Sequence, residues 1–129
     1  MTSYRIAQAA RLLGVSDDTV RRWIESEQLP AAGSPAEIPG TALAARAVEL
    51  ADAASDPTDV LSSARNRFVG IVTRVQVDGV MAQIDLQSGP HRVVSLLSAE
   101  AVRELALEVG SLAVASVKAT HVVVETPRS

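Results

Sequence analysis

The sequence predicts an α+β protein in which three helices precede a small five-stranded β-barrel with one short helix. Apolar residues recur at helical spacing through roughly the first fifty positions. After residue 62 the pattern changes to short runs of β-branched residues, separated by turns that contain glycine. We therefore expect two unlike domains, at residues 1–54 and 62–129, joined by a linker at 55–61.

The composition excludes several classes of protein. Of the 129 residues, 47% are hydrophobic and 21% are charged, which is typical of a globular chain. There is no cysteine, and the two histidines, His91 and His121, lie far apart, so we expect no disulfide and no thiolate or histidine-rich metal site. No apolar run approaches the roughly 20 residues of a membrane span, and the first residues lack the apolar stretch of a signal peptide. A cytoplasmic protein is the simplest interpretation.

Two helices separated by a glycine turn are predicted first. One covers residues 6–13, and Gly14 stops it. Ser16 is a favourable cap for the next helix, whose first turn carries two aspartates, and Leu29-Pro30 ends that helix. The predicted apolar stripes consist of Ile6, Ala9, Ala10 and Leu13 in the first helix, and of Val20, Trp23 and Ile24 in the second.

A third helix is predicted after a loop. Residues 31–40 contain two glycines and two prolines, which favour a loop. Thr41 then caps the helix, and residues 55–59, Ser-Asp-Pro-Thr-Asp, form a linker or turn. The predicted apolar face of this helix consists of Leu43, Ala47, Val48, Leu50 and Ala51.

The first three strands are predicted as two hairpins. A strand runs from Phe68 to Val77, and Asp78-Gly79 is a strong hairpin signal before a returning strand at 80–86. A second turn at 87–90 leads to a strand at 92–97. The odd-numbered face of the first strand carries Val69, Ile71, Val75 and Val77.

A short helix and two further strands complete the prediction. Ser98 caps the helix at 99–106, with Val102 and Leu105 facing inward. The last two strands are predicted at 112–118 and 122–125. Five strands with a helix between the third and the fourth are typical of an OB-like barrel.

The first two helices form a helix-turn-helix pattern, in which the second helix presents its first residues to the major groove of DNA. The stretch YRIAQAARLLGVSDDTVRRWIESEQLP, residues 4–30, resembles the winged helix-turn-helix of the MerR/excisionase type. The resemblance implies double-stranded DNA as a partner, with contacts from Ser16, Thr19, Arg21 and Arg22. A solvated helix face is the alternative interpretation of the two arginines.

The chain departs from this family at the wing. Such proteins usually follow Leu-Pro with a basic β-hairpin that contacts phosphates, whereas residues 31–40 contain Glu37 and no base. Phosphate contacts dominate affinity for DNA. We therefore expect DNA binding to be weak, or to depend on several copies that act together.

Two motifs in the second half carry another resemblance. Residues 63–66 are Ser-Ala-Arg-Asn, and residues 117–120 are Val-Lys-Ala-Thr. Together with the segment LLSAEAVRELALEVG, they resemble the TOBE-type Mop domain of molbindins and molybdate-responsive regulators over residues 62–126. The resemblance implies a molybdate or tungstate ligand. It also implies a homo-oligomer, a dimer or a trimer of dimers, with the anions where domains meet.

The chemistry of the ligand agrees with these residue types. Molybdate is a tetrahedral dianion without a proton at neutral pH, so a site made only of donors suits it and disfavours monohydrogen phosphate. Ser63 offers a hydroxyl, Arg65 and Lys118 offer charge, and Ser98, where the family has threonine, begins a helix with free N–H donors. The expected oxyanion-binding residues are Ser63, Arg65, Ser98, Lys118, Ala119 and Thr120. Structural alternatives are a turn cap for Ser63, an ion pair with Asp85 or Glu125 for Arg65, and a solvated position for Lys118.

The leading function is a molybdate-responsive DNA-binding regulator. The alternative is a molbindin-like binding or storage protein whose first half serves assembly; an enzyme is not expected, because no catalytic arrangement stands out. Residues 1–62 carry five arginines and nine acids, and residues 63–129 carry seven bases and six acids. Neither half has the basic excess of a strong DNA binder. The missing basic wing and the acidic first half favour storage. The intact SDDTVRRW stretch favours the regulator.

Overall fold

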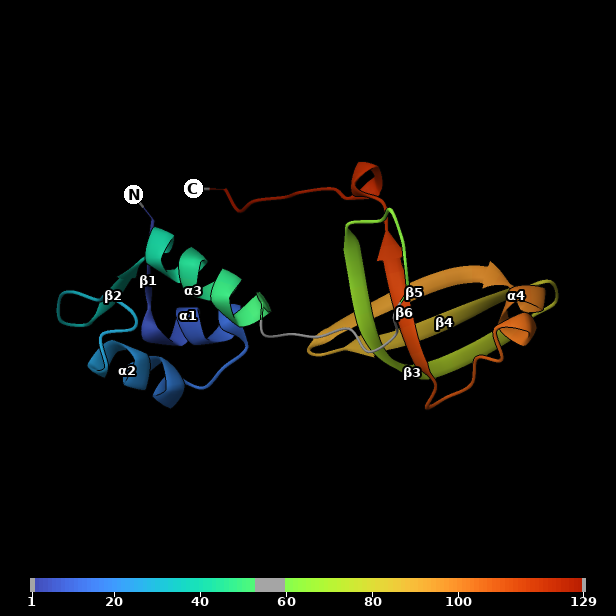
Figure 1. Cartoon of the computed structure of the whole chain (residues 1–129), viewed down its shortest axis with the longest axis horizontal. Helices are drawn as coiled ribbons and strands as arrows, with labels where there is room; N and C mark the ends of the chain where they lie inside the picture. The colour runs from blue at the N-terminus through green and yellow to red at the C-terminus, as the bar shows by residue number, and fades with distance from the viewer. Residues whose placement is uncertain (1, 53–59, 129) are drawn as a thin grey trace. The chain divides into compact units, whose positions relative to one another are not determined.

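The computed structural model describes residues 2–52 and 60–128, which form an amino-terminal and a carboxyl-terminal unit (Figure 1). The predicted linker or turn at 55–59 lies outside these residues. Within the described ranges, no helix is both long and apolar enough to cross a membrane.

The amino-terminal unit is helical, with one small sheet. Strand β1 pairs antiparallel with β2, and Tyr4 lies opposite Ile38. The prediction of a loop throughout 31–40 is therefore wrong at 37–39, because the buried side chain of Ile38 joins the core and holds this segment in a strand. The elements in order are β1 (Ser3–Arg5), α1 (Ile6–Leu13), α2 (Asp17–Glu25), β2 (Glu37–Pro39) and α3 (Gly40–Asp52).

Local signals set the boundary between α1 and α2. Gly14 ends α1 with a left-handed φ of 69°, a conformation that glycine adopts without strain. The hydroxyl of Ser16 accepts a hydrogen bond from the amide of Thr19 at 3.1 Å and so caps α2, as predicted. The prediction that α2 continues to Leu29 is wrong. The hydroxyl of Ser26 donates to the carbonyl of Arg22, and the fully buried Leu29 turns back to donate its amide to Trp23.

Helix α3 differs from its prediction at its start and along its face. It begins at Gly40, whose amide donates to the carbonyl of Thr2, so Thr41 lies inside the first turn and is not the cap. Leu43 is buried as predicted, but Val48 is 61% exposed. Ala51 is exposed as well, because α3 reaches the core near its start, at Ala42 and Leu43. The core consists of Ala9, Ala10, Val20, Leu29, Ile38 and Leu43, with Trp23 and Ile24 packed against it.

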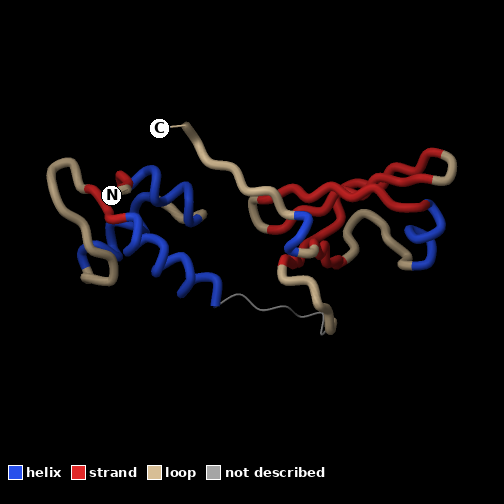
Figure 2. Tube along the Cα trace, turned by 90° about the horizontal axis from the view of Figure 1, so that it is seen from above, coloured by secondary structure: helices blue, strands red, loops and turns tan. Residues whose placement is uncertain are grey.

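The carboxyl-terminal unit is one curled antiparallel sheet with a short helix (Figures 1 and 2). The strand order is β5-β4-β3-β6, so β5 and β6 are the edges of the sheet. The core is formed by Val72, Ala82, Ile84, Leu86 and Val102. The elements are β3 (Asn66–Asp78), β4 (Met81–Ser88), β5 (His91–Ser98), α4 (Ala99–Glu104), β6 (Leu112–Val117) and the 3₁₀ turn η1 (Ala119–His121).

Four strands form this sheet in the described part of the chain, rather than the five predicted. Residues 122–125 form no strand, and the side chains of Val123 and Val124 are 81% and 87% exposed. Their β-branched composition favours a strand, but they pair with no strand in the part of the chain that the structure describes. The barrel is therefore open between β5 and β6.

Strand β3 bends where its pairing changes. It pairs with β6 up to Ile71 and with β4 from Ile71 onward, and a bulge falls between Val72 and Arg74. The extra residue shifts the inward face, so Val72 is buried and Ile71 is 50% exposed. The odd-numbered residues therefore do not share one face along the whole strand, because after the bulge Val75 packs against the core.

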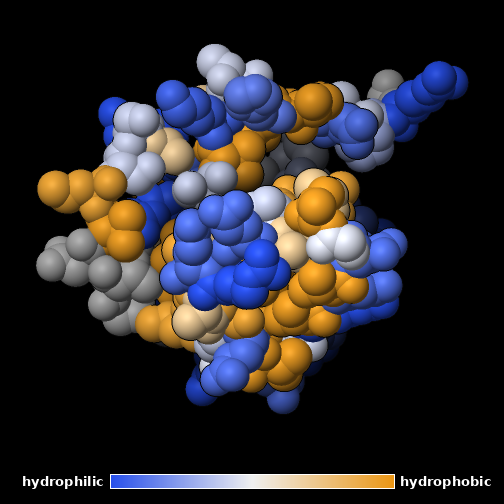
Figure 3. Space-filling view, turned by 90° about the vertical axis from the view of Figure 1, so that its right-hand side faces the viewer, coloured by the Kyte–Doolittle hydropathy of each residue, from blue (hydrophilic) through white to orange (hydrophobic). Residues whose placement is uncertain are grey.

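The hairpin and the helix cap follow their sequence signals. Asp78 lies opposite Met81 across a turn in which Gly79 has a φ of 64°. The hydroxyl of Ser98 accepts from the amide of Ala101 at 3.0 Å and caps α4. Val102 is buried as predicted. The prediction that Leu105 faces inward is wrong, because α4 ends before it and leaves it 64% exposed. Leu107 packs against the core instead. Figure 3 shows apolar side chains open to solvent on the end of the molecule that carries α4.

Candidate functional site

Five of the six predicted oxyanion residues belong to two segments at one end of the sheet. Asn66 opens β3 opposite Val117, and its side-chain amide donates to the carbonyl of Val117 at 3.2 Å. Arg65 directly precedes Asn66, and Lys118 directly follows Val117. The segment before β3 and the η1 turn therefore meet at this end (Figure 1).

The cationic side chains at this end are available to a ligand. Arg65 and Lys118 are exposed, and the side chain of neither forms an ion pair or a hydrogen bond with any residue in the described ranges. The hydroxyls of Ser63 and Thr120 belong to exposed residues as well. Two cations with two hydroxyls nearby can donate to an oxyanion from several directions.

The η1 turn adds main-chain donors. Its hydrogen bonds run from the amide of His121 to the carbonyl of Lys118 at 2.9 Å and from the amide of Val122 to the carbonyl of Ala119 at 3.3 Å. The amides of Ala119 and Thr120 open the turn and take part in neither bond. They are the two main-chain groups that the sequence predicted as anion donors.

Ser98 lies at the other end of the same sheet. It faces Met81 next to the β3–β4 hairpin, and its hydroxyl already caps α4. Figures 1 and 2 both show α4 and η1 at different ends of the unit. A single chain therefore does not bring Ser98 together with the other five residues.

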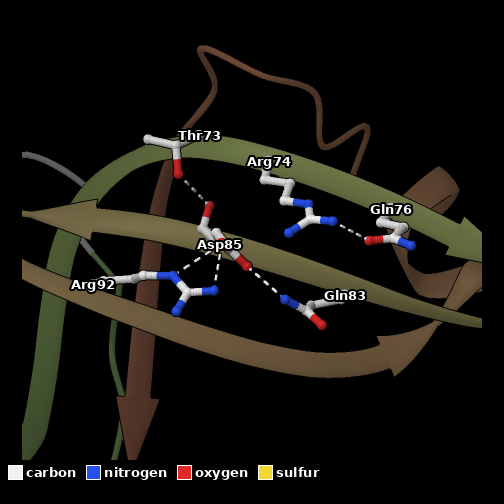
Figure 4. A network of polar contacts seen from close by, with 6 residues as sticks. All are labelled: Thr73, Arg74, Gln76, Gln83, Asp85 and Arg92. Carbon is white, nitrogen blue, oxygen red and sulfur yellow. Dashed lines mark hydrogen bonds and ion pairs between the residues drawn. The ribbon is translucent and has the colours of Figure 1, made fainter.

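Asp85 forms a polar network on the sheet that the sequence analysis did not find (Figure 4). Arg92 donates to one carboxylate oxygen through Nε at 3.0 Å and Nη2 at 2.9 Å, and Gln83 donates to the other at 2.9 Å. These hydrogen bonds, from Gln83 first and Arg92 second, lower the pKa of the buried Asp85 carboxyl. Arg65 does not pair with Asp85. The predicted turn at 87–90 was the sequence signal that could have placed Arg92 near Asp85, because it joins the two neighbouring strands that carry them.

The predicted DNA-contacting residues lie on the first turns of α2. The hydroxyls of Ser16 and Thr19 are 2.9 Å apart, and Arg22 Nη2 donates to Thr19 Oγ1 at 3.1 Å. Arg21 forms an ion pair with Asp18 at 3.0 Å, and both side chains are exposed. Val20 is buried, Ser16, Thr19 and Arg22 are joined by these hydrogen bonds, and Arg21 is held apart from them by Asp18.

A short hairpin stands where the wing was expected to be missing. The backbones of Ala32 and Glu37 exchange two hydrogen bonds, of 3.0 and 2.9 Å, at the start of β2. Glu37 accepts a hydrogen bond from the Ser3 hydroxyl at 3.2 Å. Residues 31–40, which include this hairpin, contain one acid, Glu37, and no base.

Metal ligands do not gather in the described residues. No group of three or more His, Asp or Glu side chains among them could hold a metal ion. The donors at the η1 end are cations, hydroxyls and amides, which bind anions.

The two halves of the chain match two different family models. Residues 62–124 match the family model of the TOBE domain, and residues 3–45 match a model described as a helix-turn-helix domain. The second half of this chain is thus similar to a TOBE domain. A comparison with curated proteins gave no significant match.

Three solved structures are similar to the second half of the chain, and two of them are molybdate-binding proteins. A molybdate-binding protein from Sporomusa ovata is 28% identical with a TM-score of 0.50, and the match covers 52% of this chain and all of that one. MopII from Clostridium pasteurianum is 31% identical with a TM-score of 0.49, over 51% of this chain and all of MopII. The cytoplasmic molybdate-binding protein ModG is 34% identical with a TM-score of 0.46, over 50% of this chain and 46% of ModG. The chain thus spans less than half of ModG.

Proposed function

We propose that this protein is a molybdate-sensing regulator, in which the TOBE domain binds the oxyanion and the helix-turn-helix domain binds double-stranded DNA. The observation that carries the proposal is the η1 end of the sheet. There, Arg65 and Lys118 are exposed and unpaired among the described residues, beside the amides of Ala119 and Thr120. The likeness to the Sporomusa ovata protein supports molybdate as the anion.

The donor set favours a fully deprotonated tetrahedral dianion. Ser63, Arg65, Lys118 and the η1 amides can all donate hydrogen bonds, and no carboxylate of the site accepts one. Monohydrogen phosphate would leave its proton without an acceptor. Molybdate and tungstate have nearly the same size and charge, so both are expected to bind.

The complete oxyanion site includes a second copy of the chain. Ser98 lies at the α4 end of the sheet and the other five residues at the η1 end, so Ser98 of one protomer completes the site of another. Cations from two copies repel each other without an anion, and the dianion removes this repulsion. We propose a homo-oligomer through the TOBE domains, a dimer or a trimer of dimers, that the anion stabilises by mass action.

DNA binding is proposed for the exposed first turns of α2. Arg21 and Arg22 are the two bases of this helix, and Thr19 and Ser16 lie beside them. The ion pair of Arg21 with Asp18 and the acidic hairpin at Glu37 reduce attraction to phosphate. An oligomer that presents several such helices compensates through avidity, which links anion-dependent assembly to DNA binding.

A storage or binding role is the second candidate, and the acidity of the first unit favours it. In that role the helix-turn-helix domain serves assembly. The cytoplasmic location of ModG supports the same location for this chain under either role.

Isothermal titration at neutral pH tests anion binding, and gel shift of genomic fragments with and without molybdate tests the regulator against storage. We expect heat with molybdate and tungstate, little with sulfate or phosphate, and a DNA shift that molybdate changes. An equal response to sulfate contradicts the anion assignment. Normal molybdate binding without any DNA shift at low salt favours storage.

A further inference from the structure

Arg22 lies on the side of α2 that faces away from the core of its unit. Successive residues of an α-helix are about 100° apart, so Arg22 lies about 160° around the axis from the fully buried Val20, whereas Arg21 lies about 100° from it. Trp23 and Ile24, which pack against the core, lie on the side of Val20. Arg22 is therefore near the middle of the exposed face of α2, and Arg21 is at its flank.

A chain of hydrogen bonds holds the guanidinium group of Arg22 in place. Its Nη2 donates to Thr19 Oγ1 at 3.1 Å, and the hydroxyls of Thr19 and Ser16 are 2.9 Å apart. Ser16 is itself fixed as the cap of α2, because its hydroxyl accepts from the amide of Thr19 at 3.1 Å. A guanidinium carries several N–H donors in a rigid fork, so a pair of donors remains for a ligand and loses little freedom on binding.

Arg21 is held by a charge instead. Its Nη1 forms an ion pair with the carboxylate of Asp18 at 3.0 Å, and both side chains are exposed. An exposed pair of this kind is weak, so a phosphate can compete for the guanidinium of Arg21. The carboxylate of Asp18 also repels phosphates, which lowers the affinity for DNA in general and leaves the choice among sequences to contacts with bases.

The two arginines therefore suit different parts of a DNA duplex. The middle of a helix that lies in the major groove faces the base edges, and its flanks face the phosphate backbone. Guanine is the one base that presents two acceptors there, O6 and N7, and a fork of guanidinium donors matches them. We propose that Arg22, positioned by Thr19 and Ser16, recognises a guanine in the major groove, whereas Arg21 contacts a phosphate. The inference rests on the proposed binding of double-stranded DNA and names the base that α2 selects.

Selection from a random duplex library by the full-length protein, at low salt with and without molybdate, provides the DNA for the test. We expect the selected duplexes to share a guanine. Replacing it with 7-deazaguanine, which pairs normally but lacks N7, is expected to raise the dissociation constant of the wild type by about tenfold. Arg22→Ala is expected to bind the two duplexes equally, to within about twofold. Arg21→Ala, the matched control, is expected to bind both more weakly and to keep the tenfold difference between them.

Thr19→Val tests the positioning of Arg22, because it removes the hydroxyl that accepts from Arg22 and leaves the cap formed by Ser16. We expect it to reduce the difference between the two duplexes to about threefold, since Arg22 must then be ordered on binding. Thr19→Ser restores a hydroxyl and is expected to recover the difference. Circular dichroism checks that all variants keep their helices.

The outcomes separate recognition of guanine from DNA binding itself. Bound duplexes that share no guanine overturn the inference and leave DNA binding in place. A difference between the guanine and 7-deazaguanine duplexes that survives in Arg22→Ala, or that disappears in Arg21→Ala, does the same. A wild-type protein that selects no duplex, with or without molybdate, overturns both the inference and the proposed binding of DNA.

Discussion

Ser98 and Lys118 lie at opposite ends of one four-stranded sheet. Ser98 faces Met81 beside the hairpin turn, whereas Lys118 follows Val117, which faces Asn66 at the start of β3. An oxyanion site that uses both residues needs two chains. The separation of Ser98 from Lys118 therefore makes the expected oxyanion site a testable prediction of assembly.

Complementation between chains follows from this arrangement. Ser98→Ala and Lys118→Ala each weaken molybdate binding by about tenfold or more, because each removes a donor to a charged group. When the two variants are mixed and refolded together, one kind of interface regains both residues, and we expect part of the tight binding to return in a titration. Ser98→Thr is the control, since it keeps the hydroxyl that caps α4. No recovery on mixing contradicts an oxyanion site that two chains share.

DNA binding depends on the two arginines of α2. We expect Arg21→Ala with Arg22→Ala to abolish the gel shift, and Asp18→Asn to strengthen nonspecific binding, because it frees Arg21 from its ion pair. Arg11→Ala removes a similar charge from the exposed face of α1 and serves as the control. A double variant that binds as well as the wild type shows that α2 does not contact DNA.

Gly70 is required where β3 bends over β4. A Cβ at this position would overlap the carbonyl group of Gln87, and backbone atoms cannot move aside as a flexible side chain does. Gly70→Ala is expected to lower the free energy of unfolding by about 1–3 kcal/mol or more, which denaturant titration measures. Gly89→Ala meets no atom within 4 Å and suffers only from its φ of 54°, so its loss is expected to be smaller, about 1–2 kcal/mol. The reverse order contradicts the crowding at Gly70.

The Asp85 network predicts a loss of stability in acid. The pKa of Asp85 is lowered in the folded protein, so the folded state binds this proton less readily than the unfolded state does. Its contribution is complete above the unfolded pKa, near 4, and is lost as the pH falls through the lower, folded pKa. Asp85→Asn should therefore flatten the decline of the melting temperature below about pH 4. A decline as steep in the variant as in the wild type assigns the effect to other carboxylates.

The sequence predicted those features that local chemistry determines. Gly14 and Ser16 determine the ends of their helices through their own backbone and hydroxyl, and Asp78-Gly79 sets its hairpin through a left-handed turn. The position of β2 depends instead on the burial of Ile38 against helices distant in sequence. The bulge at Thr73 depends likewise on the pairing of β3 with two different strands.

The sequence likewise predicted only part of the candidate site. The two motifs predicted that Arg65 and Lys118 meet, and the pairing of Asn66 with Val117 supports this prediction. The network around Asp85 was missed because it joins neighbouring strands across a register that no single segment specifies. The strand expected at residues 122–125 has the right composition but no partner in its own chain, which propensity alone does not reveal.

A native mass spectrum of the full-length protein, recorded with and without molybdate, tests the central claim most directly. The account predicts an assembly of two or more copies that carries bound molybdate, with the assembled fraction rising as the anion is added and not rising with sulfate. A monomer without bound molybdate, in the presence of excess anion, would contradict it.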